Sequence, residues 1–217
     1  LIVDFSPLPG DPPAVWSLPT RLQADLGCPD ALPLSIQGAG CAGLHLGLRT
    51  ACALLHAEPD LDPVLLTASD CVGATGRCLL PISILGDAAS AVVLSRHAPP
   101  HRRVPRILGV ATATLGALHE IVHLGGEPPR HQIDGRAFES KVLPVHFVMA
   151  ARVLERALGQ ARRSREQVRR LVYPNTSDLD RESASRALGL PPDRLCGPGP
   201  RRLGHGFAND MVVNLPA

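Results

Sequence analysis

Residues 34–48 read LSIQGAGCAGLHLGL, an apolar run that stops at small residues, presents one thiol at Cys41 and resumes as a helical pattern. The small residues at 38–40 and 42–43 let the backbone turn sharply and let a substrate approach closely. At the start of a helix, the positive end of the helix dipole stabilises a reactive thiolate. The pattern is typical of a nucleophile on a strand-to-helix turn. The competing interpretation is a buried cysteine that packs as a small hydrophobe.

The composition is that of a folded chain. Its 217 residues are 45% hydrophobic and 19% charged, which excludes a disordered protein and allows one large or two small domains. The net charge of +2 comes from scattered arginines, with Lys141 as the only lysine. We therefore expect no concentrated basic face and no nucleic-acid partner.

Cysteine usage and hydropathy indicate a cytoplasmic protein without a membrane partner. No stretch approaches the length of a membrane span, and Leu1–Asp4 lacks the charged region of a signal peptide. The six cysteines form no CxxC pair, so we expect reduced thiols. The spacing of Cys71 and Cys78 matches no usual zinc-ligand pattern, and we predict no metal site.

Hydrophobic periodicity predicts an α/β chain with a mostly parallel sheet. Strands are expected at 1–3, 32–36 and 63–68, with helices at 14–26 and 41–56 between them. Further along, the patterns predict strands at 79–85 and 88–94 meeting at a tight turn, a boundary at 97–105, strands at 107–117 and 168–173, helices at 147–160 and 178–188, and the start of a helix at 208–215.

Several short motifs follow one another in a recognisable order. They are Gly38–Leu44 around the thiol, Ala68–Asp70, Gly86–Leu94, Tyr173–Thr176 and Leu203–Gly206. This order resembles the thiolase superfamily and, within it, most closely ketoacyl-acyl-carrier-protein synthase III. The resemblance implies a thiolase-like fold: two α/β halves with mixed sheets layered between helices.

The same resemblance implies a division of the chain. Residues 1–99 would be the remainder of the N-terminal half, which carries the nucleophile, and residues 100–217 would belong to the C-terminal half. Members of the family begin before Leu1 and continue past Ala217, so the resemblance implies a chain that lacks both ends.

The candidate catalytic residues are Cys41 as acyl-accepting nucleophile, His205 as base and Asn175 as hydrogen-bond donor to an oxyanion. Synthase III enzymes carry a histidine after the proline and an asparagine after the glycine of the two later motifs. Here Asn175 follows Pro174 and His205 follows Gly204, an exchange that is similar to the thiolase arrangement. His205 could instead be an ordinary loop histidine, and Asn175 a turn residue. Asp210 could orient His205 or simply be a first-turn carboxylate.

The function implied by the resemblance is acyl transfer in fatty-acid or polyketide-type metabolism. An acyl group would pass from coenzyme A or an acyl carrier protein to Cys41 and then to a second substrate. The second step would be a decarboxylative Claisen condensation, or transfer to an oxygen or nitrogen acceptor. No permanently bound cofactor is implied, and the partners would be the thioester carrier and a second copy of the chain in a homodimer.

Two other classes of function stay open. His119-Glu120-Ile121-Val122-His123 matches HExxH, the zinc-protease motif that places two imidazoles on one helix face with a glutamate base. However, Gly125-Gly126-Glu127-Pro128-Pro129 would end any helix at once, and the preceding residues resemble a strand. The other class is a non-catalytic, thiolase-like partner subunit, against which the presence of Cys41 argues.

Overall fold

A four-stranded mixed sheet forms the centre of the first half of the chain in a computed structural model of the protein. The strand order is β2-β1-β3-β6. Strands β1 (Ile2–Asp4), β2 (Pro33–Ser35) and β3 (Val64–Asp70) are parallel, whereas β6 (Ala88–Leu94) runs antiparallel to β3. The structure describes residues 1–6, 17–72, 76–79, 83–101, 103–125, 130–197 and 200–215.

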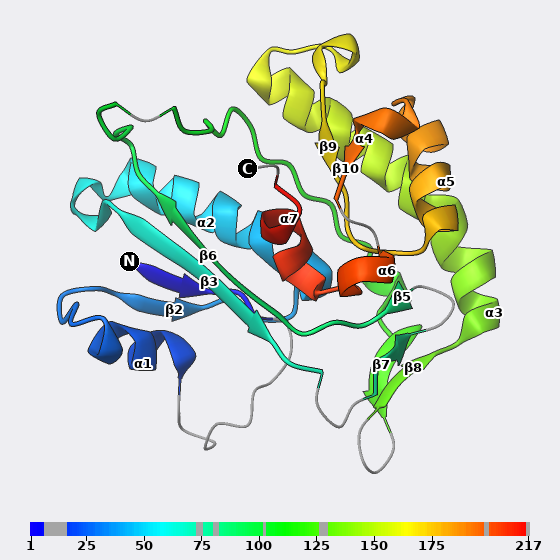
Figure 1. Ribbon diagram of the computed structural model, residues 1–217, viewed down its shortest axis with the longest axis horizontal. Helices are drawn as coiled ribbons and strands as arrows, with labels where there is room; N and C mark the ends of the chain where they lie inside the picture. Colours follow the sequence, from blue (N-terminus) through cyan, green and yellow to red (C-terminus); the bar gives the residue numbers. More distant parts are fainter. Residues whose placement is uncertain are drawn as a thin grey trace.

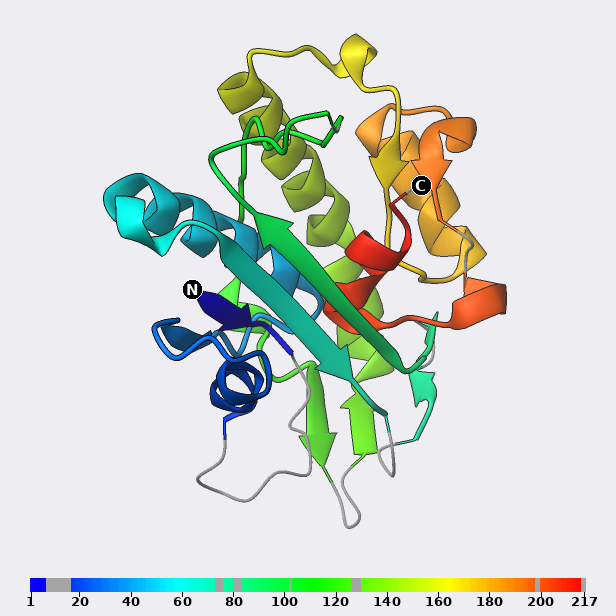
Figure 2. The same ribbon diagram turned by 60° about the vertical axis from the view of Figure 1, so that its left-hand side comes forward.

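Helix α2 (Gly43–Ala57) packs along one face of this sheet (Figures 1 and 2). Two glycines allow the close approach: a side chain at Gly43 would meet the carbonyl oxygen of Phe5 at 2.7 Å, and one at Gly47 would meet the Phe5 ring at 3.3 Å. The apolar stripe of the helix joins β1 and β3 in a buried core, whose burial is the main force holding the layers together. Helix α1 (Leu18–Asp25) is capped by the Ser17 hydroxyl, which accepts from the backbone N–H of Thr20.

The second half is mainly helical. Helix α4 (Leu143–Ala161) packs against α5 (Asp178–Leu188), and the short parallel pair β9 (Leu171–Val172) and β10 (Leu195–Cys196) lies beside them (Figure 1). Helix α5 begins with the Ser177 cap and ends at Gly189, which is in the left-handed conformation that favours glycine. Shorter elements include α3 (Gly135–Ala137), α6 (Pro200–Leu203) and two antiparallel pairs: β4 (Cys78–Leu79) with β5 (Ser83–Ile84), and β7 (Val122–Gly125) with β8 (Arg130–Ile133).

The end of the chain returns to the first half. A single helical turn, η8 (Phe207–Asn209), leads into α7 (Asp210–Val213), which lies between the four-stranded sheet and the β9–β10 pair (Figure 1). Ala208 is fully buried in the core that β1, β3 and α2 form. This packing brings residues more than 160 positions apart to the same place.

The sequence-based interpretation was wrong in two places. Residues 107–115 form no strand but an irregular segment, held to α4 by the backbone N–H of Val110, which donates to the Gln160 side chain at 2.8 Å. The expected hairpin of 79–85 with 88–94 is also absent, because β6 pairs with β3 and leaves β5 to pair with β4. Part of the predicted helix at 14–26 and part of the strand at 79–85 lie outside the described residues.

The fold class and most of the predicted elements are confirmed. The chain is α/β with a mixed sheet, and the strand before Cys41 and the helix after it occur where the sequence predicts them. Among the described residues, no helix is both long and apolar enough to span a membrane.

Candidate active site

Cys41 lies on a tight turn between β2 and α2. The turn is the single 3-10 turn η1 (Gly40–Ala42), and α2 begins directly after it at Gly43. Gly38 and Gly40 both have positive φ angles, of 80° and 50°, which glycine adopts readily. The Cys41 side chain is exposed, so a thioester can reach the sulfur from solvent.

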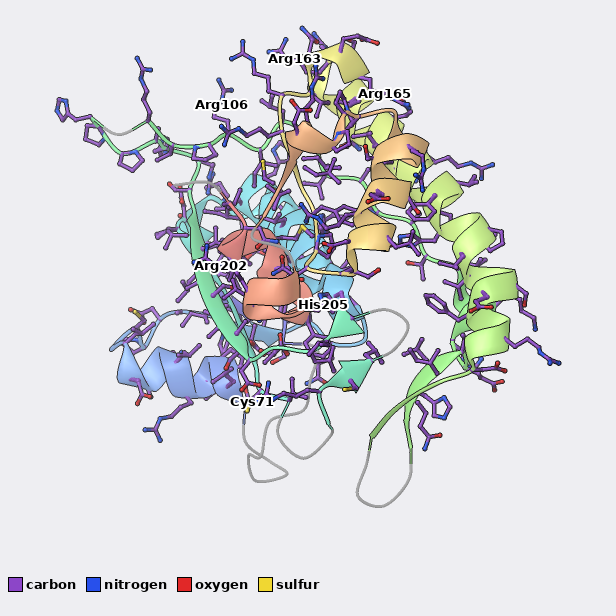
Figure 3. All side chains as sticks on the ribbon, turned by 45° about the vertical axis from the view of Figure 1, so that its right-hand side comes forward. Cys71, Arg106, Arg163, Arg165, Arg202 and His205 are labelled. Atoms are coloured by element: carbon purple, nitrogen blue, oxygen red, sulfur yellow. The ribbon has the colours of Figure 1, made fainter. Side chains whose placement is uncertain are left out.

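His205 is held in place through its backbone. Its N–H donates to the Ile84 carbonyl at 2.7 Å, and its own carbonyl accepts from the Gly86 N–H at 3.0 Å. Only a glycine fits at position 86, because a Cβ there would stand 2.2 Å from the Leu203 carbonyl oxygen. These contacts anchor a buried imidazole, which is 3% exposed and lies near the middle of the molecule (Figure 3).

The structure brings Cys41, His205 and Asp210 together in one line of hydrogen bonds. The sulfur of Cys41 is 3.0 Å from Nε2 of His205, and Nδ1 of the same ring is 2.5 Å from Oδ2 of Asp210. A carboxylate only accepts, so Nδ1 carries a proton and Nε2 faces the sulfur. The thiol, imidazole and carboxylate thus have the geometry of a nucleophile, its base and the group that orients the base.

Asp210 is fixed by backbone and side-chain donors around it. Its Oδ1 accepts from the Gly206 N–H at 2.8 Å and from the Asn175 side chain at 3.2 Å, and its Oδ2 accepts from the Asn175 backbone N–H at 2.7 Å. The carboxylate is 2% exposed. Every partner of the carboxylate is a donor, so these contacts hold the side chain in one position beside the imidazole.

The charge state of His205 follows from these contacts. Burial opposes the charged ring and lowers its pKa, but the hydrogen bond to Asp210 and the contacts with Cys41 outweigh this effect. Together they raise the pKa of His205 from 6.5 to about 10. The raised pKa favours the imidazolium form of His205, whose Nε2 lies 3.0 Å from the Cys41 sulfur.

Asn175 lies in the same cluster but contacts different groups from those expected for an oxyanion donor. Its side-chain N–H donates to Asp210, and its side-chain oxygen accepts from Asn214 at 3.0 Å. Its carbonyl accepts from the Ser83 hydroxyl at 2.8 Å. One N–H of the amide therefore supports the carboxylate behind the imidazole.

The sequence alone left the role of Asp210 open and gave no sign of Asn214. Asp210 comes only five residues after His205, and the structure shows that this short separation turns the carboxylate back onto the ring. The role of Asp210 is indicated in the sequence only by Gly-His-Gly-Phe-Ala-Asn-Asp at 204–210, since asparagine and aspartate favour turns and helix caps. Asn214 donates to the Tyr173 carbonyl and to Asn175, a role that no local pattern indicates.

The zinc-protease motif does not adopt the conformation that zinc binding needs. His119 lies in a turn after the short helical turn η4 (Gly116–Leu118), and His123 lies in strand β7. The two imidazoles therefore do not share a helix face. Within the ranges that the structure describes, no group of three or more His, Cys, Asp or Glu side chains is placed to hold a metal ion.

Solved structures with the same fold include an acyltransferase and 3-oxoacyl-(acyl carrier protein) synthase III enzymes. The acyltransferase ChlB3 matches with a TM-score of 0.80 and 28% identity, covering 99% of this chain and 67% of ChlB3. The 3-oxoacyl-(acyl carrier protein) synthase III FabH from Pseudomonas aeruginosa PAO1 matches with a TM-score of 0.79 and 20% identity, covering 98% of this chain and 65% of the synthase. The corresponding synthase III from Aquifex aeolicus VF5 gives 0.75 and 18%, covering 99% and 65%. No protein-family model matches the sequence.

These matches confirm the resemblance to synthase III that the motifs indicate. The chain has the thiolase-like fold of these enzymes over nearly its whole length. It spans about two thirds of the length of each of these structures.

Proposed function

We propose that this chain, a structural relative of ChlB3 and the synthase III enzymes, carries the acyl-loading site of a thiolase-like acyltransferase. Cys41 would be the nucleophile, His205 the base and Asp210 the residue that orients His205. The observation that supports this best is His205, whose ring contacts the sulfur at 3.0 Å and the carboxylate at 2.5 Å. Asn175 would position Asp210.

In the loading step, the Cys41 thiolate attacks the carbonyl carbon of an acyl thioester of coenzyme A or of an acyl carrier protein. A C–S bond to Cys41 forms, and the bond to the carrier's sulfur breaks. The imidazolium of His205 gives its Nε2 proton to the departing thiolate. His205 is then neutral and ready to act as a base.

In the second step, the acceptor approaches the acyl group on Cys41. His205 takes the acceptor's proton as the acceptor attacks the carbonyl, and Cys41 leaves as a thiolate beside the newly formed imidazolium. Asp210 keeps its hydrogen bond to Nδ1 of His205 throughout and stabilises the charged ring. The cycle returns both residues to their starting state and needs no bound cofactor.

The contacts of Asn175 favour an oxygen or nitrogen acceptor over carbon–carbon bond formation. A decarboxylative Claisen condensation develops an enolate, which needs fixed hydrogen-bond donors beside the thiol. The Asn175 side chain donates one N–H to Asp210 and accepts from Asn214, whereas the Cys41 sulfur contacts the His205 ring. A base paired with a carboxylate suits the deprotonation of an alcohol or amine.

We also propose how the chain is divided and what it binds. Residues 1–99 and 100–217 would be the remainders of two thiolase-like halves with the site between them, a division that the separate cores around α2 and α5 support. The expected partners are the thioester carrier and a second copy of the chain. The expected setting is fatty-acid or polyketide-type metabolism.

Intact-mass analysis of the purified protein incubated with a panel of acyl-coenzyme A thioesters tests the loading step. We expect one acyl group per chain, lost in Cys41→Ala and kept in Cys28→Ala, which removes a different exposed thiol. Equal acylation of the Cys41→Ala protein would overturn the proposal. No acylation of either protein would favour a non-catalytic partner subunit.

The acceptor class is tested on the acylated protein. Small alcohols and amines should release the acyl group as ester or amide, and His205→Ala should slow this release. A malonyl thioester that releases carbon dioxide and yields a 3-oxoacyl product would instead establish the condensation.

A further inference from the structure

A second buried amide lies beside the triad and points away from it. Asn209 is fully buried, and its side-chain N–H groups donate to Oδ2 of Asp70 at 2.8 Å and to the Ala88 carbonyl at 3.2 Å. Its side-chain oxygen accepts from the Ser90 hydroxyl at 2.6 Å. Both side-chain contacts of the nitrogen and the contact of the oxygen are thus directed at the sheet.

The three partners lie on two neighbouring strands. Asp70, the last residue of β3, stands opposite Ala88, the first residue of β6, and Ser90 lies two residues further along β6. One side chain therefore ties the turn that carries Asp210 to both strands. A buried amide is costly unless every donor and acceptor is paired, so the pairing holds it in one position.

Asn209 and Asp210 are consecutive, but the Asn209 side chain contacts the sheet and the Asp210 side chain contacts His205. The Asn209 backbone N–H donates to the Gly206 carbonyl at 3.0 Å and closes the turn, while the Asp210 carboxylate faces the His205 ring. The backbone of His205 is held separately, through Ile84 and Gly86. Asn209 thus supplies a hydrogen-bonded link between the sheet and the turn that carries Asp210.

We infer that Asn209 is a positioning residue, which sets the distance from the Asp210 carboxylate to His205 and, through it, the pairing of the imidazolium with Cys41. This inference rests on the proposed function. Loss of the Asn209 contacts allows Asp210 to shift, which weakens the imidazolium–thiolate pair without touching the thioester. The turnover number should fall roughly tenfold to a hundredfold, while KM for the acyl donor stays unchanged.

The test measures the alkylation rate of Cys41 by iodoacetamide as a function of pH, with peptide mass analysis to count Cys41 alone. Asn209→Ala should slow alkylation at neutral pH and move the pH profile towards that of an ordinary thiol. Ser90→Ala removes only the hydroxyl donor to Asn209 and should give a smaller change in the same direction. If Asn209→Ala does not fold, the pH profile of Ser90→Ala tests the inference in its place.

Two further variants separate positioning from stability. Ser185→Ala removes another buried hydroxyl, which donates to the Leu190 carbonyl at 2.6 Å in the α5 region, and should leave the alkylation profile unchanged whatever its effect on the melting temperature. Asp70→Asn keeps a side-chain oxygen that can accept from Asn209, so it should stay closer to the wild-type profile than Asn209→Ala does.

Failure of this inference differs from failure of the proposed function. If the folded Asn209 and Ser90 variants keep the wild-type profile and turnover number, while His205→Ala removes the reactivity of Cys41, the positioning role is wrong and the proposed function stands. If Cys41→Ala still becomes acylated, the proposed function itself is wrong.

Discussion

Replacing Asp210 by asparagine tests the triad most directly, because it keeps the shape of the side chain and removes its charge. The carboxylate accepts from the His205 ring, from the Gly206 N–H, and from the backbone and side chain of Asn175. An asparagine retains one oxygen, so its NH₂ group must face donors on one side or the other. Either the imidazole loses its acceptor, or the side chain at position 210 loses the contacts with Gly206 and Asn175 that hold it in place.

The size of the effect follows from the interaction that disappears. A hydrogen bond to a charged group contributes about 1.5–3 kcal/mol, which corresponds to roughly a tenfold to 150-fold change in rate. The pKa of His205 should fall from about 10 towards 6.5, because Asp210 supplies the largest of the effects that raise it. Because Asp210 stabilises the cation, the imidazolium of the wild type persists until the pH approaches the raised pKa of His205. In the variant, the imidazolium is lost near neutral pH.

Single-turnover loading of Cys41, followed by quenched intact-mass analysis across pH, measures this effect. At neutral pH we expect Asp210→Asn to load more slowly by the factor given above, with its rate falling further as the pH rises through the lowered pKa of His205. Asp180→Asn is the matched control, since Asp180 is a half-buried carboxylate that accepts from Tyr173 and Thr176 outside the triad. A folded Asp210→Asn protein that loads at the wild-type rate with the wild-type pH profile would refute the reasoning.

Three other predictions concern the site and its support. In Cys41→Ala, the pKa of His205 measured by NMR titration should fall, because the contact with the sulfur that raises it is gone; an unchanged value would show that the sulfur does not interact with the ring. Gly86→Ala should reduce acyl loading at least tenfold, because the new methyl group would clash with the Leu203 carbonyl and shift His205; normal loading would contradict this contact. Burial raises the pKa of Asp4, so its charged form destabilises the fold as the pH rises above 3.8. Asp4→Asn should therefore raise the urea midpoint of unfolding slightly at pH 7 and leave it unchanged in acid. A lowered midpoint at pH 7 would contradict this prediction.

The elements around Cys41 could be predicted from the sequence because they depend on local patterns. An apolar strand, a run of small residues and an apolar stripe with helical spacing give β2, the turn η1 and α2 nearly where the sequence places them. Residues 107–115 show the limit of such reasoning. Their Val, Thr and Gly content is typical of a strand, but the backbone bonds to α4 instead of to another strand, and a strand needs a partner.

The pairing of β6 illustrates the same limit in the sheet. The sequence shows apolar runs on both sides of Gly86-Asp87, a pattern that a tight hairpin would also give. In the structure, β6 lies along β3 over seven residue pairs, and Val92 and Leu94 pack against the core of this sheet. Which strands pair is a question of tertiary packing, and the local pattern does not contain it.

By itself, the sequence determined the chemistry available to this protein: a thiol on a strand-to-helix turn, and an imidazole and an amide in motifs ordered as in the thiolase superfamily. The tertiary structure decided which of these groups meet. His205 contacts Cys41 because Ala208 and its neighbours pack into the core of the first half. Asn175 donates two hydrogen bonds to the Asp210 carboxylate, one from its backbone and one from its side chain. The reason is physical: residue types are local, whereas hydrogen bonds between residues 164 positions apart exist only after the core has formed.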